Sequence, residues 1–329
     1  MKDLLHHLYA GHLLTTPQAH SLLLDIGRGQ NGPEEISALF SAINMRPVHL
    51  PELRGFRDAM LELATPLDLE GRRTIDIVGT GGDGKNTFNI STLACVVVAA
   101  AGYPVTKHGS YGVSSSVGSS DVLIALGYEF TNDADELRRR LDRDGICFLH
   151  APLFHPAMKQ VVPVRKALRV RTFFNIMGPL LNPARPTYQL FGTFSAEVQR
   201  LYDYLLQEEA DREYAIVHAL DGYDEVSLTG TTAVRSSRGQ RRLLPADFGL
   251  ERLDPTALHG GETAEEGKRI FLSVLDGTAT AAQTDVVCAN AGLAIQVMEP
   301  EWSLPDCVAA ARGCIADGRA LKVLNAIVR

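Results

Sequence analysis

The stretch that decides the fold is residues 74–121, TIDIVGTGGDGKNTFNISTLACVVVAAAGYPVTKHGSYGVSSSVGSSD. An apolar, β-branched run over 75–78 is stopped by the glycines of 79–84. Such a run predicts a buried strand that delivers a loop to the edge of a sheet. Asn89-Ile90-Ser91-Thr92 then opens an apolar helix over 93–101. Its first turn presents free N–H groups and the positive end of the helix dipole to the loop, which favours an anion site.

A second strand, loop and helix follow within the same stretch. The strand begins at Val105 and ends in Lys107-His108-Gly109, and residues 114–120 supply hydroxyls before a helix that starts at Asp121. Two loops that each follow a strand and open a helix predict one pocket for several phosphates. Each loop alone also fits a simple strand-to-helix turn. Neither is a Walker A or a GxGxxG dinucleotide motif.

Length, charge and cysteine content limit the class of protein. The 329 residues suffice for one large domain, or for a large and a small one. A net charge of −7 argues against a nucleic-acid-binding surface, which needs a basic stripe. The five cysteines lack CxxC spacing and are expected to be reduced core thiols. We find no apolar leader and no run of about 18 apolar residues, so we expect a cytoplasmic protein with no membrane contact.

Residues 1–69 carry helix signals and no strand signal. Leu4, Leu5, Leu8 and Tyr9 lie at helical spacing. Apolar residues at the same spacing follow Thr16-Pro17, Gly32-Pro33 and Leu50-Pro51, so the sequence predicts four short amphipathic helices. A unit of this size cannot bury four apolar faces by itself. We therefore expect it to pack on the rest of the chain or on a second subunit.

The remaining chain alternates strand and helix patterns. Strands are predicted over 146–149, 189–193 and 214–219, a half-exposed strand over 226–228, and a bent loop over 170–184. Asp224 and Glu225 follow one of these strands and a glycine turn. Mg²⁺ bound with phosphates usually takes one or two carboxylates, so the pair is a candidate Mg²⁺ anchor. A solvent-facing acidic turn is the alternative interpretation.

These motifs together resemble a known family. GTGGDGKNTFNIST at 79–92 and KHGSYGVSSSVGSSD at 107–121 are similar to the phosphoribosyl pyrophosphate site of anthranilate phosphoribosyltransferases, in the nucleoside phosphorylase-like class. FFNIMGPLLNPARP at 173–186 and HALDGYDEVS at 218–227 match the same family in order and spacing. The similarity covers nearly the whole chain. Each motif alone is weak, but the set is specific.

The resemblance implies an α/β fold class. It implies a small all-helical N-terminal domain over 1–70, joined by part of 165–185. It also implies a large α/β domain over 71–329 with a central mixed or parallel sheet flanked by helices. The implied reaction is the Mg²⁺-dependent transfer of 5-phosphoribosyl from phosphoribosyl pyrophosphate to the anthranilate amine, early in tryptophan biosynthesis. A homodimer is implied as well.

The resemblance also assigns roles by position. Arg165 would face the anthranilate carboxylate, and no side chain is assigned as a catalytic acid or base, since the amine is already a nucleophile. The implied Mg²⁺ ligands are Ser91, Asp224 and Glu225. The implied phosphoribosyl pyrophosphate site is Gly79, Gly82, Asp83, Thr87, Asn89, Ile90, Ser91, Thr92, Lys107, His108, Gly109, Gly112, Val113, Ser114, Ser115 and Ser119. The implied anthranilate site is Gly79, His108, Ser110, His155, Arg165, Met177 and Pro179.

The chain departs from the family pattern at two neighbouring positions. The family usually has asparagine where this chain has Ser110, and often arginine where it has Tyr111. The family asparagine touches anthranilate, and serine cannot offer both an amide donor and a carbonyl acceptor. The departure predicts a weaker or altered preference for the aromatic acceptor.

Two other functions remain open at this point. A pyrimidine nucleoside phosphorylase shares the fold and a KHG-type loop, but it uses inorganic phosphate and has no need of a metal pair at Asp224-Glu225. A non-catalytic relative of the fold that binds nucleic acid would need a basic surface, which the net charge of −7 disfavours.

Overall fold

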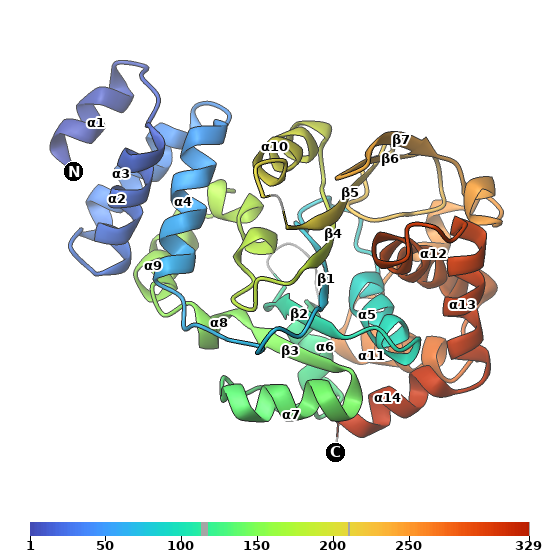
Figure 1. Cartoon of the computed structure of the whole chain (residues 1–329). Coiled ribbons are helices and arrows are strands. Elements are labelled where there is room, and N and C mark those ends of the chain that lie inside the picture. The colour runs from blue at the N-terminus through green and yellow to red at the C-terminus, as the bar shows by residue number, and fades with distance from the viewer. Residues whose placement is uncertain (113–117, 210, 329) are drawn as a thin grey trace. The chain divides into compact units, whose positions relative to one another are not determined.

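The computed structural model describes residues 1–112, 118–209 and 211–328 (Figure 1). The chain divides into two compact units. The first, Met1–Leu67 with Ala151–Pro183, is all-helical. The second, Asp68–His150 with Ala184–Arg329, is α/β, so the predicted fold class is confirmed. The helical unit takes in a longer second segment than residues 165–185.

Capping residues and prolines begin the helices of the first unit. The Thr15 side chain accepts a hydrogen bond from the Gln18 N–H, and Pro17 lies in the first turn, where its missing N–H costs nothing. The four helices predicted over residues 1–69 are confirmed. The helices of this unit are α1 Lys2–Tyr9, α2 Thr16–Gly27, α3 Pro33–Asn44, α4 Leu50–Glu62, α8 Ala151–Phe154 and α9 Met158–Leu168, followed by two 3₁₀ helices, η1 Phe173–Ile176 and η2 Gly178–Leu181.

An aromatic cluster explains why the second segment belongs to the helical unit. The Phe173 ring stacks on Phe56 of α4 at 4.4 Å and meets Phe40 of α3 edge-on at 5.5 Å between centroids. All three rings are buried. Aromatic pairs of this geometry add about 0.5–1.5 kcal/mol beyond the burial of their area. The apolar faces of α3 and α4 are thus covered by residues more than a hundred positions away.

A seven-stranded sheet forms the centre of the second unit. Its order is β3-β2-β1-β4-β5-β6-β7; β1 to β5 run parallel, and β6 and β7 are antiparallel. The runs of β-branched and aromatic residues suit strands buried on both faces. The strands are β1 Ile75–Gly79, β2 Val105–Gly109, β3 Ile146–His150, β4 Tyr188–Gly192, β5 Glu213–Ala219, β6 Thr232–Ser236 and β7 Gly239–Leu243.

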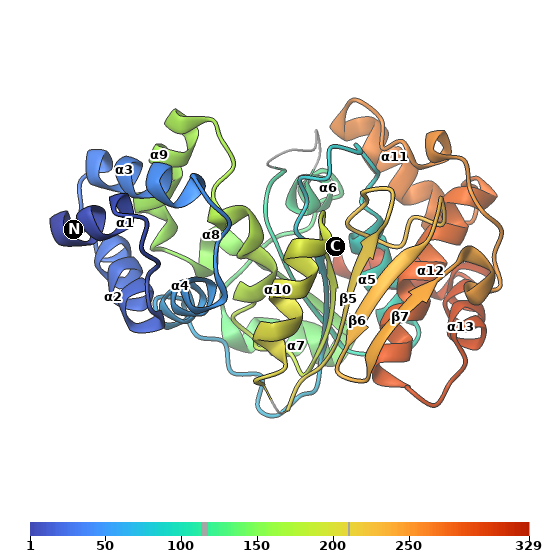
Figure 2. The same cartoon turned by 90° about the horizontal axis from the view of Figure 1, so that it is seen from above.

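Helices cover both faces of this sheet. On one face, the apolar α5 lies beside the small-residue helix α12, and α10 lies across β5 on the other face (Figures 1 and 2). Small side chains such as Ala289 and Gly292 in α12 permit this close helix packing. The helices of this unit are α5 Ile90–Ala100, α6 Ser119–Ala125, α7 Ala134–Asp144, α10 Ala196–Leu206, α11 Ala264–Leu275, α12 Ala281–Met298, α13 Leu304–Ala316 and α14 Arg319–Ile327, with 3₁₀ helices η3 Pro245–Phe248 and η4 Pro255–Leu258.

The strand predicted over residues 226–228 is wrong. The segment is buried but joins no strand, because a side chain satisfies both the N–H and the carbonyl of its first residue, Val226. Asn290 of α12 accepts from the Val226 N–H at 3.1 Å and donates to the Val226 carbonyl at 2.8 Å. The β6–β7 hairpin, in turn, was not predicted. Its residues are mostly polar and half-exposed, which weakens the apolar signal of a strand.

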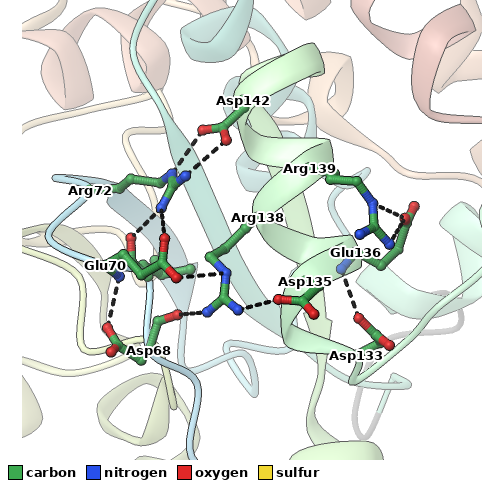
Figure 3. Close-up of polar contacts among 10 residues, drawn as sticks. Asp68, Glu70, Arg72, Asp133, Asp135, Glu136, Arg138, Arg139 and Asp142 are labelled. Carbon is green, nitrogen blue, oxygen red and sulfur yellow. Dashed lines mark hydrogen bonds and ion pairs between the residues drawn. The ribbon is translucent and has the colours of Figure 1, made fainter.

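Ion pairs tie the start of the second unit to α7. Arg72 donates to both oxygens of Asp142, at 2.8 and 2.9 Å, and Arg138 donates to the Asp68 carbonyl at 2.7 Å (Figure 3). Glu70 lies between the two guanidinium groups. A single exposed ion pair adds little to the stability of the fold. Here, several contacts of Arg72 and Arg138 together define the path of residues 68–72.

Two further properties concern the whole described chain. Cys95, Cys147, Cys288, Cys307 and Cys314 are all buried and unpaired, as predicted, and burial raises the pKa of each thiol. Among the described helices, none combines the length and apolar character needed to cross a bilayer.

Candidate active site

The topology of the sheet points to one crevice. The chain proceeds from β1 outward to β2 and from β4 outward to β5, in opposite directions, so the order of strands switches between β1 and β4. Ligands of open α/β sheets bind outside the carboxyl ends of the strands at such a switch. Gly79 ends β1 opposite Gly192, which ends β4.

The first glycine loop lies over two carboxylates at this edge. The Gly81 N–H donates to Asp224 Oδ2 at 2.6 Å, and the Thr87 hydroxyl donates to Glu225 Oε1 at 2.8 Å. The Thr80 N–H donates to the Gly192 carbonyl at 2.9 Å. Residues 80–87 are therefore fixed to the end of β4 and to the segment that follows β5, both far away in the sequence.

Glycines at the strand ends make room for Asp224. A Cβ on Gly79 would lie 2.3 Å from Asp224 Oδ2, and a Cβ on Gly192 would lie 1.6 Å from the Asp224 carbonyl oxygen. Real Cβ atoms do not approach heavy atoms so closely. Asp224 thus occupies space that only glycine leaves open.

The carboxylates are crowded, which suits a bound cation. Burial, with the nearby charge of Asp83, raises the pKa of Asp224 to about 7. Burial and the charge of Asp224 raise the pKa of Glu225 as well. Asp83 Oδ2 is buried and has no hydrogen-bond partner among the described residues. A divalent cation would offset this repulsion, so the donors fit Mg²⁺.

These carboxylates need further ligands to complete a magnesium site. Across residues 1–112, 118–209 and 211–328, no group of three or more His, Cys, Asp or Glu side chains is arranged to hold a metal. Mg²⁺ at phosphate sites usually has one or two protein carboxylates and takes its other oxygens from phosphates and water. Asp224 and Glu225 match that incomplete protein shell.

The Lys107 side chain and the first turn of α5 supply positive charge at the same edge of the sheet as the carboxylates. The Lys107 side chain is buried; its Nζ donates to the Ile77 carbonyl at 2.6 Å and lies 3.4 Å from Ser91 Oγ. Ser91 and Thr92 lie in the first turn of α5, where backbone N–H groups lack intrahelical partners. Thr92 Oγ1 is buried and has no partner in the described part of the chain. These groups favour anionic oxygens.

Asp121 holds the two ends of the second loop together. Its Oδ2 accepts from the Gly112 N–H at 2.9 Å and from the Gly118 N–H at 2.8 Å. The Ser119 hydroxyl donates to the Ser110 carbonyl at 3.2 Å. Val113, Ser114 and Ser115 of the predicted site lie outside the described residues.

The predicted acceptor residues are divided between the two units. Arg165, His155, Met177 and Pro179 belong to the helical unit, whereas Gly79, His108 and Ser110 belong to the α/β unit. His155 Nε2 donates to the Leu181 carbonyl at 3.0 Å, and burial lowers the pKa of His155 to about 4, so the ring is neutral at pH 7. Met177 and Pro179 are buried.

Comparison with known proteins identifies the family. Residues 71–321 match the family described as "Glycosyl transferase family, a/b domain", and residues 2–64 match its helical bundle domain. An anthranilate phosphoribosyltransferase of Cytophaga hutchinsonii is 50% identical over 329 residues, covering 100% of both chains. One from Bacteroides fragilis is 47% identical over 328 residues, covering 100% of this chain and 99% of the relative. This chain belongs to the anthranilate phosphoribosyltransferase family.

Solved structures of the family have the same fold. The anthranilate phosphoribosyltransferase of Thermus thermophilus superposes with a TM-score of 0.91 at 36% identity, over 98% of both chains. The Saccharomyces cerevisiae enzyme, in complex with PRPP and Mg, has a TM-score of 0.89 at 27% identity and covers 96% of this chain and 93% of its own. The predicted membership in the family is therefore confirmed.

The structure gathers most of the predicted donor-site residues of this family member at one edge of the sheet. It also adds residues that the sequence analysis missed. Asn290 fixes the peptide group directly after Glu225, and Asp121 fixes the second loop. An asparagine between two alanines, in the buried middle of the small-residue helix α12, was the available signal for Asn290. The residues gathered at this edge are Gly79, Gly82, Asp83, Thr87, Asn89, Ile90, Ser91, Thr92, Lys107, His108, Gly109, Asp224 and Glu225.

Proposed function

We propose that this chain is an anthranilate phosphoribosyltransferase that acts in tryptophan biosynthesis. It transfers the 5-phosphoribosyl group from phosphoribosyl pyrophosphate to the amine of anthranilate and releases pyrophosphate. The observation that carries the proposal is the switch-point site, where Asp224 and Glu225 lie under a glycine loop, in a chain 50% identical to a named relative. The assignment of individual residues is part of the proposal.

The chain's own residues would bind the leaving group. The bond from C1 to the pyrophosphate oxygen breaks, and its electron pair stays on pyrophosphate. Lys107 and the N–H groups at the start of α5 stabilise that negative charge, which is the electrostatic route to catalysis. Asp224, Glu225 and Ser91 would hold Mg²⁺. When bound, Mg²⁺ neutralises charge on the pyrophosphate.

The acceptor side requires orientation more than proton transfer. The amine lone pair of anthranilate forms the new bond to C1, and the amine proton passes to solvent. Because the amine is already a nucleophile, positioning supplies most of the acceleration. Arg165 has no carboxylate partner among the described residues, so its guanidinium is available for the anthranilate carboxylate.

The direct test is the loss of anthranilate fluorescence after adding phosphoribosyl pyrophosphate and Mg²⁺ to the purified chain. We expect a saturable decay that depends on Mg²⁺. Phosphorolysis of thymidine without Mg²⁺ is the matched control, and activity there with no loss of anthranilate would contradict the proposal.

Ser110→Asn tests the departure from the family pattern. The main-chain carbonyl of Ser110 accepts from the Ser119 hydroxyl and the Ser120 N–H, and these contacts do not depend on its side chain. We expect the substitution to lower the KM for anthranilate and leave the KM for phosphoribosyl pyrophosphate unchanged, because asparagine adds an amide donor and acceptor. Steady-state kinetics with each substrate varied measures both. A change confined to phosphoribosyl pyrophosphate would place Ser110 outside the acceptor site.

We further propose that the chain works as a cytoplasmic homodimer. Support comes from the helical unit, which carries half of the large apolar side chains that the described chain exposes to solvent, since a concentration of apolar surface favours association. They are Tyr9, Leu13, Met45, Leu153, Val162 and Val170. Sedimentation velocity at two concentrations should report twice the monomer mass of 35.7 kDa. A monomer at both concentrations would exclude a stable dimer.

A further inference from the structure

Arg165 of α9 is held by two neighbours from one short segment. Its Nη2 donates to Asn175 Oδ1 at 3.2 Å, and its guanidinium lies 5.6 Å from the centroid of the Phe174 ring. Both neighbours belong to η1. Burial lowers the pKa of Arg165, and the described residues offer it no carboxylate. The cation is thus fixed in direction but not neutralised.

Asn175 is oriented by a second hydrogen bond. Its Oδ1 also accepts from the Thr172 N–H at 2.9 Å, at the start of η1. The Arg165 guanidinium and the Thr172 N–H are both donors, so the oxygen of the Asn175 amide must face them. Its Nδ2 must then point to the other side. The Thr172 side chain is itself buried, which limits movement of the chain at the start of η1. Asn175 therefore links the 3₁₀ helix to the guanidinium through one oxygen atom.

A neutral amide differs from a carboxylate at this position. An aspartate would accept the same two hydrogen bonds with the same shape, but it would form an ion pair with Arg165. The charge of Arg165 would then be satisfied within the chain, and an anionic ligand would meet an added negative charge. An asparagine orients the guanidinium without competing for it.

We propose that Asn175 is a positioning residue that presents the uncompensated Arg165 to the carboxylate of the acceptor. This inference rests on the proposed function and deepens it, because it names the residue that keeps Arg165 directed and available for the carboxylate of the acceptor. Asn175 acts through Arg165 in this account, and η1 serves to place the amide.

The test compares Asn175→Asp with Asn175→Ala. Asn175→Asp keeps both hydrogen bonds, so we expect an unchanged thermal midpoint, an unchanged KM for phosphoribosyl pyrophosphate, and a KM for anthranilate roughly 10-fold higher. Asn175→Ala loses the hydrogen bonds but adds no charge, so it should raise that KM less. A residue that only caps η1 would give the opposite order, with alanine worse than aspartate, and that order would overturn the proposal.

Two further variants test whether the added charge must lie beside Arg165 to have its effect. Gln30→Glu adds the same charge at an exposed residue of the same unit, so we expect the KM for anthranilate to be unchanged. Arg165→Ala alone should raise this KM roughly 10- to 100-fold. Adding Asn175→Asp to Arg165→Ala should change it little further. Multiplicative effects would mean that Asn175 acts independently of Arg165, against the proposal.

Binding measured apart from turnover distinguishes this inference from the proposed function. Anthranilate is titrated into each variant without phosphoribosyl pyrophosphate, and its own fluorescence reports binding. Normal turnover by the wild type with equal binding to the wild type and Asn175→Asp would overturn the inference alone. Weaker binding to Asn175→Asp, with no wild-type turnover, would support the carboxylate site and refute the transferase function. No binding and no turnover in the wild type would refute both.

Discussion

Asp224→Asn combined with Glu225→Gln is expected to lower kcat/KM by roughly 10²- to 10³-fold at low Mg²⁺, as removal of a preorganised charge partner does elsewhere. Both substitutions keep a side-chain oxygen that can accept the native hydrogen bonds. The amide oxygen at position 224 can accept from the Gly81 N–H, and the one at position 225 can accept from the Thr87 hydroxyl. The fold should therefore survive, and the loss should trace to charge at the cation site. Activity measured across a Mg²⁺ titration should show a half-saturation point shifted to higher Mg²⁺.

Asp221→Asn is the matched control for this pair. Asp221 lies three residues away on the same turn, where it accepts a hydrogen bond from Thr229. The substitution removes one negative charge from the turn and leaves Asp224 and Glu225 in place. We expect a Mg²⁺ dependence close to that of the wild type. If the Asp224 and Glu225 variant kept the wild-type Mg²⁺ dependence, the pair would not be the metal anchor.

Gly192→Ala is expected to destabilise the α/β unit by about 3 kcal/mol, at the upper end of the usual cost of overpacking. The new Cβ would lie 1.6 Å from the carbonyl oxygen and 2.8 Å from the carbonyl carbon of Asp224, which are main-chain atoms. Neither can rotate away as a side chain can, so β4 or the turn at Asp224 must move. Thermal unfolding should show a midpoint lower by roughly 6–12 °C, with loss of activity.

Substitutions at two other glycines serve as controls for Gly192→Ala. Gly313 lies in α13, where an added Cβ would meet no atom within 4 Å, so Gly313→Ala should be neutral or stabilise by roughly 0.5–1 kcal/mol. Gly79→Ala would press mainly on the Asp224 carboxylate, which can rotate, so we expect a half-saturation point shifted to higher Mg²⁺ with a smaller change in the thermal midpoint. An unchanged midpoint for Gly192→Ala would show that the turn at Asp224 yields easily.

Local patterns predicted the elements that bear the donor site. The strand, glycine loop and helix over residues 75–100 follow from an apolar run, glycines and a polar helix start, which are all signals within a few residues. Hydrophobic spacing and first-turn prolines likewise placed the four N-terminal helices. Such features depend on neighbouring residues alone.

The parts that escaped prediction depend on contacts over long distances in the sequence. Val226 was assigned to a strand because its apolar alternation is local, while Asn290, which satisfies its peptide group, lies 64 residues later. The requirement for glycine at 192 comes from Asp224 and is invisible in the sequence around β4. Nor could any local pattern show that Phe173 would fill the core between α3 and α4.

The five buried thiols make this chain suited to site-specific labelling. Thiolate is the reactive form, and burial both shields each sulfur and raises its pKa, to about 12 for Cys95, Cys147 and Cys288. A maleimide dye should therefore leave the native chain almost unmodified. A cysteine introduced at Glu251, an exposed residue of the α/β unit, would carry a single fluorophore without removal of any native cysteine. Spectroscopic reporters can thus be placed on the folded enzyme one position at a time.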